Sequence, residues 1–184
     1  MKNDNRKRLM EMMEKVNPDS VNSTPTEKEI IDDILSLDEG VGDVLSKMKE
    51  YARKGMLTAT IILSVASAVA AGNVGGDLSA NDVVKAGAEM VDDTHEKKVY
   101  AFFVGMADQY LKRASVEDTE HAKALEQVIN YYALLWDGAN PEPLTGKAAA
   151  VANSIAKNAN ELDPSSFDMY VKLGTDRLKR TKKQ

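Results

Sequence analysis

The sequence predicts an all-α protein, a bundle of about seven to eight helices around one uncharged central helix. Apolar residues recur at spacings of three and four along most of the chain, which is the period of a helix. The run from Gly55 to Gly76 contains no charged residue, although charged residues make up 29% of the chain. No segment combines alternating apolar and polar residues with a hairpin turn, as paired strands would require.

The 184 residues are enough for one domain with a sizeable core. We expect residues 1–23 to form an N-terminal arm and linker, and residues 24–184 to form a single α-helical domain with a basic C-terminal tip. The boundary falls at the turn-forming residues 17–23, NPDSVNS, which separate the arm from the first strong helix signal.

Within the arm, helical spacing places Leu9, Met10, Met13 and Val16 on one face. A Met-rich face is adaptable and suits docking onto a partner or onto the body of the protein. The alternative is a frayed terminal helix without a partner.

The first helix of the domain is predicted from its start signal. Thr24 can cap it, Pro25 suits the first helical position, and Glu27 can return the hydrogen bond of a capping box. This helix is expected to end near Gly40, and a second helix to cover about residues 41–54.

The uncharged stretch carries two rows of residues four apart, so both rows lie along a helix. One row is branched and apolar, and the other is small: Leu57, Ile61, Val65 and Val69, then Thr60, Ser64, Ala68 and Gly72. Small residues let a second helix backbone approach closely, a device that membrane helices also use. The strictly apolar part, 57–71, has a length closer to that of a buried core helix than of a membrane span. We predict a core helix and keep membrane insertion of residues 55–76 as the alternative.

Ser79 and Asp82 form a capping-box pattern for the next helix, which is expected to run to about Val91. Two long helices, 94–114 and 115–136, follow with a short break between them, which favours an antiparallel hairpin. Their aromatic-rich faces are expected to share one core.

The segment 137–144, DGANPEPL, is a second clear break in the helical pattern. After it, Thr145 can cap an alanine-rich helix that ends near Leu162. Asp163 and Pro164 then start a final helix that runs into the basic tip.

Charge and cysteine content narrow the classes of function. The chain has no Cys, which excludes disulfides, thiol catalysis and thiolate metal sites. The formal net charge is -5, and it becomes -10 once five basic residues of the tip are left out: Arg177, Lys179, Arg180, Lys182 and Lys183. An acidic body with a basic tip predicts no broad nucleic-acid surface, only a weak and salt-sensitive contact through the tip.

Both histidines follow a carboxylate by three residues, Asp92 before His95 and Asp118 before His121. Di-metal helical bundles use a comparable Glu-x-x-His pair from two helices, so these four residues are the candidate metal ligands. Here the acid is Asp and each pair falls at a predicted helix start, where acids offset the helix dipole, and Ser115 with Asp118 makes another capping box. Capping explains the pairs better, and we predict no metal, no cofactor and no catalytic residue.

The opening peptide KNDNRKRLMEMMEKVNPDS resembles a terminal peptide found on many uncharacterised proteins of tailed phages and their marine hosts. The resemblance covers about a tenth of the chain and transfers no functional residue. It implies a phage-encoded protein. Phage particles contain compact helical proteins stored in the capsid, and some of these enter membranes when DNA is delivered.

We therefore expect a non-enzymatic helical structural or assembly protein, phage-encoded and virion-associated, that acts through contacts with itself or other particle proteins. The alternatives are a membrane-active protein of ejection or pore type that inserts the 55–76 helix, and a carboxylate/His metal-binding helical protein. A phage origin would place it in the virion or the host cytoplasm. The interaction candidates are the apolar arm residues Leu9, Met10 and Met13 and the basic residues Arg177, Lys179 and Arg180.

Overall fold

The computed structural model of the protein describes residues 24–36, 41–74, 79–114 and 118–181. Throughout these ranges the regular secondary structure is helical, with no strand, which confirms the predicted all-α fold. The helices are α2 (Glu27–Leu35), α3 (Val41–Arg53), α4 (Ala59–Ala70), α5 (Ala80–Glu89), α6 (Asp93–Arg113), α7 (Thr119–Trp136), α8 (Gly146–Ala159) and α9 (Pro164–Thr181).

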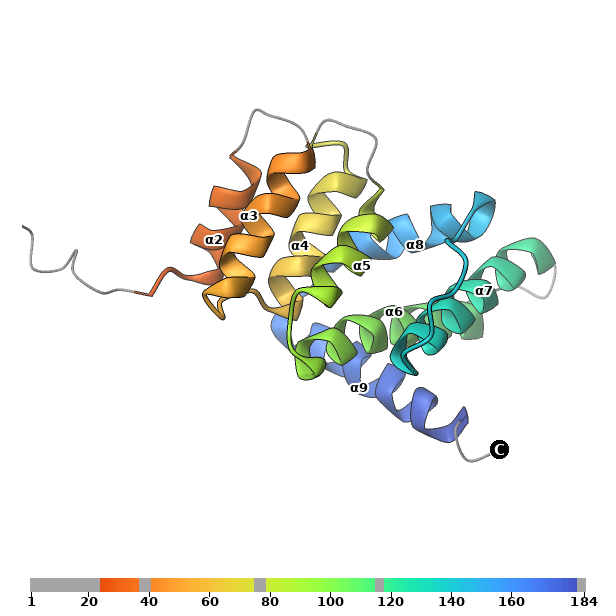
Figure 1. Cartoon of the computed structure of the whole chain (residues 1–184). Coiled ribbons are helices and arrows are strands. Elements are labelled where there is room, and N and C mark those ends of the chain that lie inside the picture. Colours follow the sequence, from red (N-terminus) through yellow and green to blue (C-terminus); the bar gives the residue numbers. More distant parts are fainter. Residues whose placement is uncertain (1–23, 37–40, 75–78, 115–117, 182–184) are drawn as a thin grey trace, which may run out of the picture.

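The helices form two neighbouring groups (Figure 1). At one end α2, α3, α4 and α5 stand side by side, and at the other end α6, α7, α8 and α9 cross one another. Helix α4 joins the groups because it packs against α2 and α5 on one side and against α6 and α8 on the other. A single cluster of buried apolar side chains includes residues from every described helix. Helices α3 and α9 each contribute one face to it and expose the other.

Helix α4 is the buried, uncharged helix that the sequence predicts. Its branched side chains are almost fully buried, with Ile61, Ile62 and Val65 at 0% exposure. Thr58 caps its start by accepting a hydrogen bond from the Ile61 N–H at 3.4 Å. Burying large aliphatic side chains removes apolar area from water, which is the main favourable term in folding.

A membrane-spanning helix needs both length and sustained apolar character. No helix in the described part of the chain meets both requirements.

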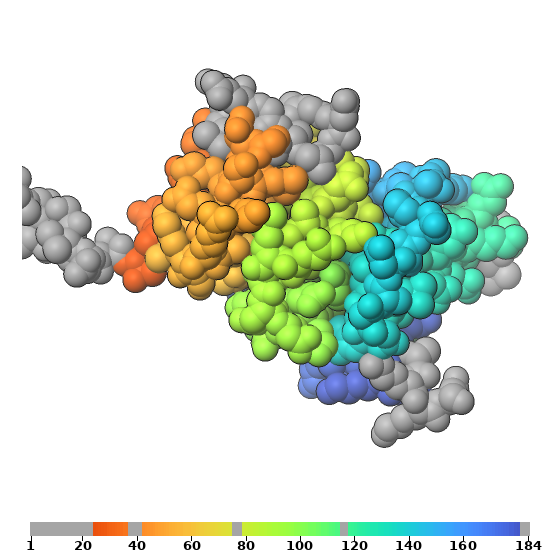
Figure 2. All heavy atoms as spheres, viewed as in Figure 1, coloured from red at the N-terminus to blue at the C-terminus, as the bar shows by residue number. Residues whose placement is uncertain are grey.

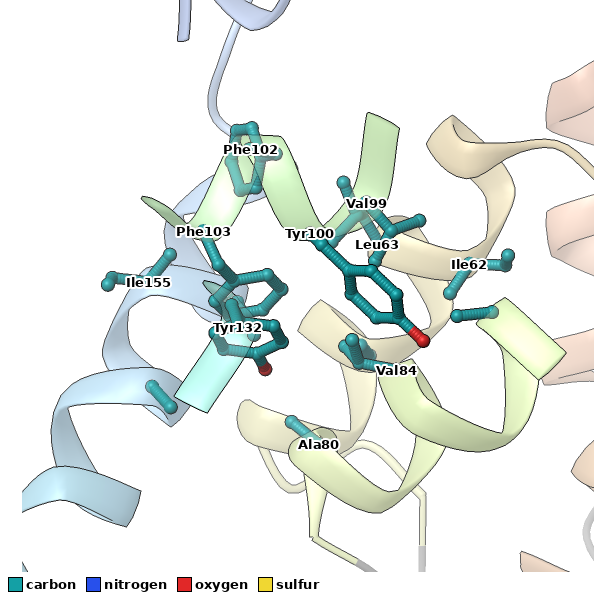
Figure 3. Packing of buried hydrophobic residues seen from close by; sticks show 14 of the residues in the cluster. Ile62, Leu63, Ala80, Val84, Val99, Tyr100, Phe102, Phe103, Tyr132 and Ile155 are labelled. Atoms are coloured by element: carbon teal, nitrogen blue, oxygen red, sulfur yellow. The ribbon is translucent and has the colours of Figure 1, made fainter. Parts of the chain in front are cut away.

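Helix α6 is a second central helix, and it packs against α4, α5, α7, α8 and α9. It forms the predicted hairpin with α7, and the two helices share an aromatic core as expected. The rings of Phe103 and Tyr132 stack with centroids 4.2 Å apart and planes at 16°, and Ile155 of α8 lies beside them (Figure 3). The aromatic side chains that the sequence concentrates in this third of the chain therefore pack on one another.

Two side chains tie α8 to α4. The Ser67 hydroxyl donates to the Lys157 carbonyl at 2.8 Å, and the Asn160 side-chain amide donates to the Ser64 carbonyl at 3.2 Å. Hydrogen bonds from short side chains to the partner backbone require closely spaced helices. Ser64 belongs to the predicted small-residue row and contributes its backbone carbonyl, whereas Ser67 lies outside that row.

A still closer approach occurs where α9 crosses α6. A Cβ atom added at Gly174 would lie 1.8 Å from the Ala101 carbonyl oxygen, and one added at Gly105 would lie 2.0 Å from the Tyr170 carbonyl oxygen. Both positions therefore require glycine, because any side chain would overlap the partner backbone. The sequence analysis did not identify this crossing.

Helix starts agree with the predictions in part. Ser79 and Asp82 form the predicted capping box of α5. The predicted box of Thr24 and Glu27 is wrong: Thr26 caps α2, the Glu29 N–H donates to Thr26 Oγ1 at 3.3 Å, and the Thr26 N–H donates to Glu29 Oε2 at 2.7 Å. The cap therefore lies two residues later than predicted, and the Glu27 carboxylate accepts from Thr58 of α4 instead. Ser115 lies outside the described residues, and Asp118 itself caps α7.

Candidate functional site

The described residues line a cleft between the starts of α2, α4 and α9 and the first turns of α6. Its volume is about 360 Å³, within the roughly 300–1,000 Å³ range of ligand pockets. The apolar part of its wall is formed by Ala59, Ala159, Leu162, Pro164 and Phe167. We call this cavity the α4–α9 cleft.

The first turn of α4 supplies one polar wall of the α4–α9 cleft. The Thr58 hydroxyl donates to Glu27 Oε1 at 2.6 Å, which ties the start of α4 to the start of α2. The Ala59 N–H donates to His95 Nδ1 at 3.4 Å, which ties the start of α4 to the start of α6. These contacts satisfy amide and hydroxyl groups that a helix start otherwise leaves without an intrahelical partner.

The rim of the α4–α9 cleft carries exposed groups of both signs. Lys98 comes from α6, Asp168 from α9 and Glu27 from α2, and Thr60 stands between them on α4. An apolar wall with a charged rim matches an amphipathic segment, which has one apolar face and charged flanks. The chemistry of the cleft is thus suited to binding.

The two carboxylate–histidine pairs lie on different helices and act as caps. The Asp92 carboxylate accepts from the N–H groups of Thr94 and His95 at 2.9 and 3.0 Å, and the Asp118 carboxylate accepts from the His121 N–H at 2.9 Å. The hydrogen bond from the His95 backbone lowers the pKa of Asp92. Capping by the two carboxylates is confirmed, but Asp118 is the N-cap of α7 and not the third helical residue that the predicted box with Ser115 requires.

As candidate metal ligands the four residues are not brought together. Asp92 and His95 lie at the start of α6 and Asp118 and His121 at the start of α7, and each carboxylate is used by backbone amides. Among the residues that the structure describes, no group of three His, Asp or Glu side chains could hold a metal ion. His95 instead lies in the wall of the α4–α9 cleft, a position that its own sequence neighbourhood does not reveal.

The interaction candidates of the C-terminal helix separate into two kinds. Arg177 reaches across the helix crossing to Asp108, a carboxylate that is only 4% exposed and also accepts from Lys112 Nζ at 2.6 Å. Burial lowers the pKa of Arg177. Lys179 and Arg180 are exposed at the end of α9. The arm candidates Leu9, Met10 and Met13 lie outside the described residues.

Helix α9 also presents an apolar patch that the sequence analysis missed. Met169 and Leu134 are the two large hydrophobic side chains described as exposed, each at 47%. Leu134 has polar residues on its face of α7, whereas Met169 is followed one turn later by the half-buried Leu173. Helix α9 packs mainly on α6, so this outer face is left to solvent. The signal in the sequence was the spacing of Met169 and Leu173, four positions apart and therefore on one face of the helix.

A second depression lies where α5 and the start of α6 border the end of α7, on the face shown in Figure 2. Its volume is about 310 Å³, and its wall includes the Tyr100 hydroxyl, which donates to Glu96 Oε1 at 3.1 Å. Burial, followed by the charge of Glu96, raises the pKa of Tyr100 well above its usual value. Lys97 Nζ lies 6.0 Å from the centre of the Trp136 ring at the same edge, so the protein's own ammonium group covers this aromatic face.

No protein-family model matches the chain, and comparison with curated proteins and with solved structures likewise yields no match. Function is therefore inferred from the contacts, burial and charge of the chain itself.

Proposed function

We propose that the protein is a non-enzymatic helical assembly protein that works by protein–protein contacts, and that a second copy of the chain is one of its partners. The observation that carries this proposal is the outer face of α9, where Met169 is 47% exposed and Leu173 lies on the same face. Covering such a pair removes apolar area from water, which stabilises a complex by about 25 cal/mol for each Å² buried.

Charge supports a second copy as the partner. Lys179 and Arg180 are exposed at the end of the same helix, Lys172 is exposed within it, and the chain as a whole carries a net charge of -5. A basic helix end on an acidic molecule is attracted to the acidic body of another copy and repelled by its basic end. Such contacts are screened by salt, so association should weaken as ionic strength rises.

The setting that we propose is a phage particle, with other particle proteins as further partners. The resemblance of the N-terminal peptide to that of tailed-phage proteins supports this setting. The position of the gene tests it: neighbours that encode capsid and tail proteins would support the proposal, and metabolic neighbours would count against it.

The contact face is tested by sedimentation of the full-length chain over a range of concentrations. We expect self-association that Met169→Glu with Leu173→Glu weakens by at least tenfold, equivalent to about 1.4 kcal/mol. Leu134→Glu is the matched control, because Leu134 is equally exposed but lies on α7, and it should leave association unchanged. A wild-type protein that stays monomeric at every concentration, or a control variant that dissociates equally, would refute this assignment.

A further inference from the structure

We propose that the α4–α9 cleft is the docking site of the chain's own N-terminal arm, residues 1–16. The occupant is inferred from the apolar wall of the cleft, its distance along the chain from the arm, and its charge.

The apolar wall is the first argument. Leu162 and Phe167 are half-buried: each packs on the core with part of its surface and lines the open cleft as well. Filling a concave site of this size with another apolar side chain removes the apolar surface of both from water, which lowers the free energy. The arm carries Leu9, Met10 and Met13 at helical spacing, and methionine adapts to irregular gaps and contacts aromatic rings favourably.

The tether is the second argument. Glu27 lines the cleft and lies three residues after Thr24, the first described residue. The linker 17–23 can extend by roughly 23–25 Å, at about 3.3–3.6 Å for each residue. The arm is therefore held at an effective concentration on the order of millimolar near the cleft, so even a weak contact suffices for docking.

The charge of the rim is the third argument. Glu27 and Asp168 line the cleft, and the exposed Glu161 and Asp163 adjoin its wall residues Leu162 and Pro164 in the chain. Lys98 is the basic side chain that the described wall contributes. The arm brings three consecutive basic residues, Arg6, Lys7 and Arg8, directly before its apolar face. The two carboxylates that line the cleft outnumber the single lysine of its described wall, and this excess of negative charge favours and orients docking of a basic segment.

Cross-linking in the full-length protein tests the proposal, because the natural chain has no Cys and two can be introduced cleanly. The cleft pair is Glu14→Cys with Thr60→Cys, which leaves the apolar face of the arm and the acidic rim intact. The control pair is Glu14→Cys with Glu126→Cys, since Glu126 is exposed on α7, a helix of the group away from α2 (Figure 1). Both are treated with a short bis-maleimide at low protein concentration.

We expect an intramolecular product from the cleft pair to form at least about tenfold faster than from the control pair. Adding Leu9→Asn and Met13→Asn to the cleft pair should remove this advantage, because the tether then remains but the apolar contact is lost. Equal rates for the two pairs, or an advantage that survives the asparagine substitutions, would overturn the proposal. A dimeric product would also overturn it and would assign the cleft to the arm of a second copy. Met169 and Leu173 are unchanged in these variants, so the result is independent of the contact face on α9.

Discussion

Replacing Gly174 with alanine should loosen the attachment of α9. The added Cβ would lie 1.8 Å from the Ala101 carbonyl oxygen, whereas ordinary contact begins at 3.4 Å. The two helix backbones would therefore have to separate by about 1.6 Å, the difference between these distances. No rotamer change can relieve the overlap, because both clashing atoms are fixed to the helix backbones.

The magnitude follows from two opposing effects. Overpacking a well-packed core typically costs about 1–3 kcal/mol and occasionally more, and a backbone clash belongs at the upper end. Separation also weakens contacts that depend on the crossing, such as the stacking of Phe102 on Phe167 at 5.2 Å and the burial of Leu178. Against this, alanine stabilises a helix by up to about 1 kcal/mol relative to glycine. We expect the free energy of unfolding to fall by about 2–3 kcal/mol net.

The assay is equilibrium unfolding in urea, monitored by circular dichroism. The slope of the free energy of unfolding against urea concentration is compared between variants. Gly42→Ala is the matched control: Gly42 lies in α3 and a Cβ added there meets nothing within 4 Å. This variant should be more stable than the wild type by about 0.5–1 kcal/mol, since only the helix propensity changes. If Gly174→Ala gave the same gain as Gly42→Ala, the close crossing of α6 and α9 would be wrong.

Three further predictions concern acid stability, a tyrosine and the membrane alternative. The pKa of Asp92 is lowered in the folded protein, so its contribution is present above its unfolded pKa and is lost as pH falls below about 4. Asp92→Asn keeps a capping side chain but removes its charge. Urea unfolding measured between about pH 5 and pH 2, which spans the usual pKa of a carboxyl group, should show that the variant loses less free energy of unfolding than the wild type as the pH falls. The Tyr51 hydroxyl donates to Asp33 at 2.7 Å, and this hydrogen bond raises the pKa of Tyr51 to about 12. In Asp33→Asn, a titration followed by phenolate absorbance should show the pKa of one tyrosine moved toward the usual value of about 10. An unchanged titration would contradict the contact. The five largest buried side chains of α4 would gain only about 1.5–3 kcal/mol by insertion, and their departure would expose to water the apolar faces of the helices that pack on them. We therefore expect the protein to stay with the soluble fraction in liposome flotation.

Much of the fold is visible in short-range sequence patterns. The capping box of Ser79 and Asp82 joins residues three apart, and the break at 137–144 is marked by Gly and Pro. The same locality explains the error at α2. Both Thr24 and Thr26 are followed three residues later by Glu, so the local pattern fits either start. The structure has Thr26 and Glu29 in the box, while Glu27 contacts Thr58, far along the chain.

The candidate site was much less predictable. His95 was noticed only for its local partner Asp92, whereas the structure places it against the first amide of α4 and in the wall of the α4–α9 cleft. Arg177 was grouped with the basic tip, and it instead meets the buried Asp108. In each case the partner lies many residues away, and residue spacing carries no information on which helices meet.

The sequence by itself determined that the chain is helical, that one helix is uncharged, and where most helices begin and end. These properties depend on periodicity and on hydrogen bonds between residues a few positions apart. Only the tertiary structure decided that α9 crosses α6 at Gly105 and Gly174, that a cleft forms beside α4, and that Met169 remains exposed. Those properties depend on which helix faces meet, and close packing selects among many pairings that local patterns leave equally acceptable.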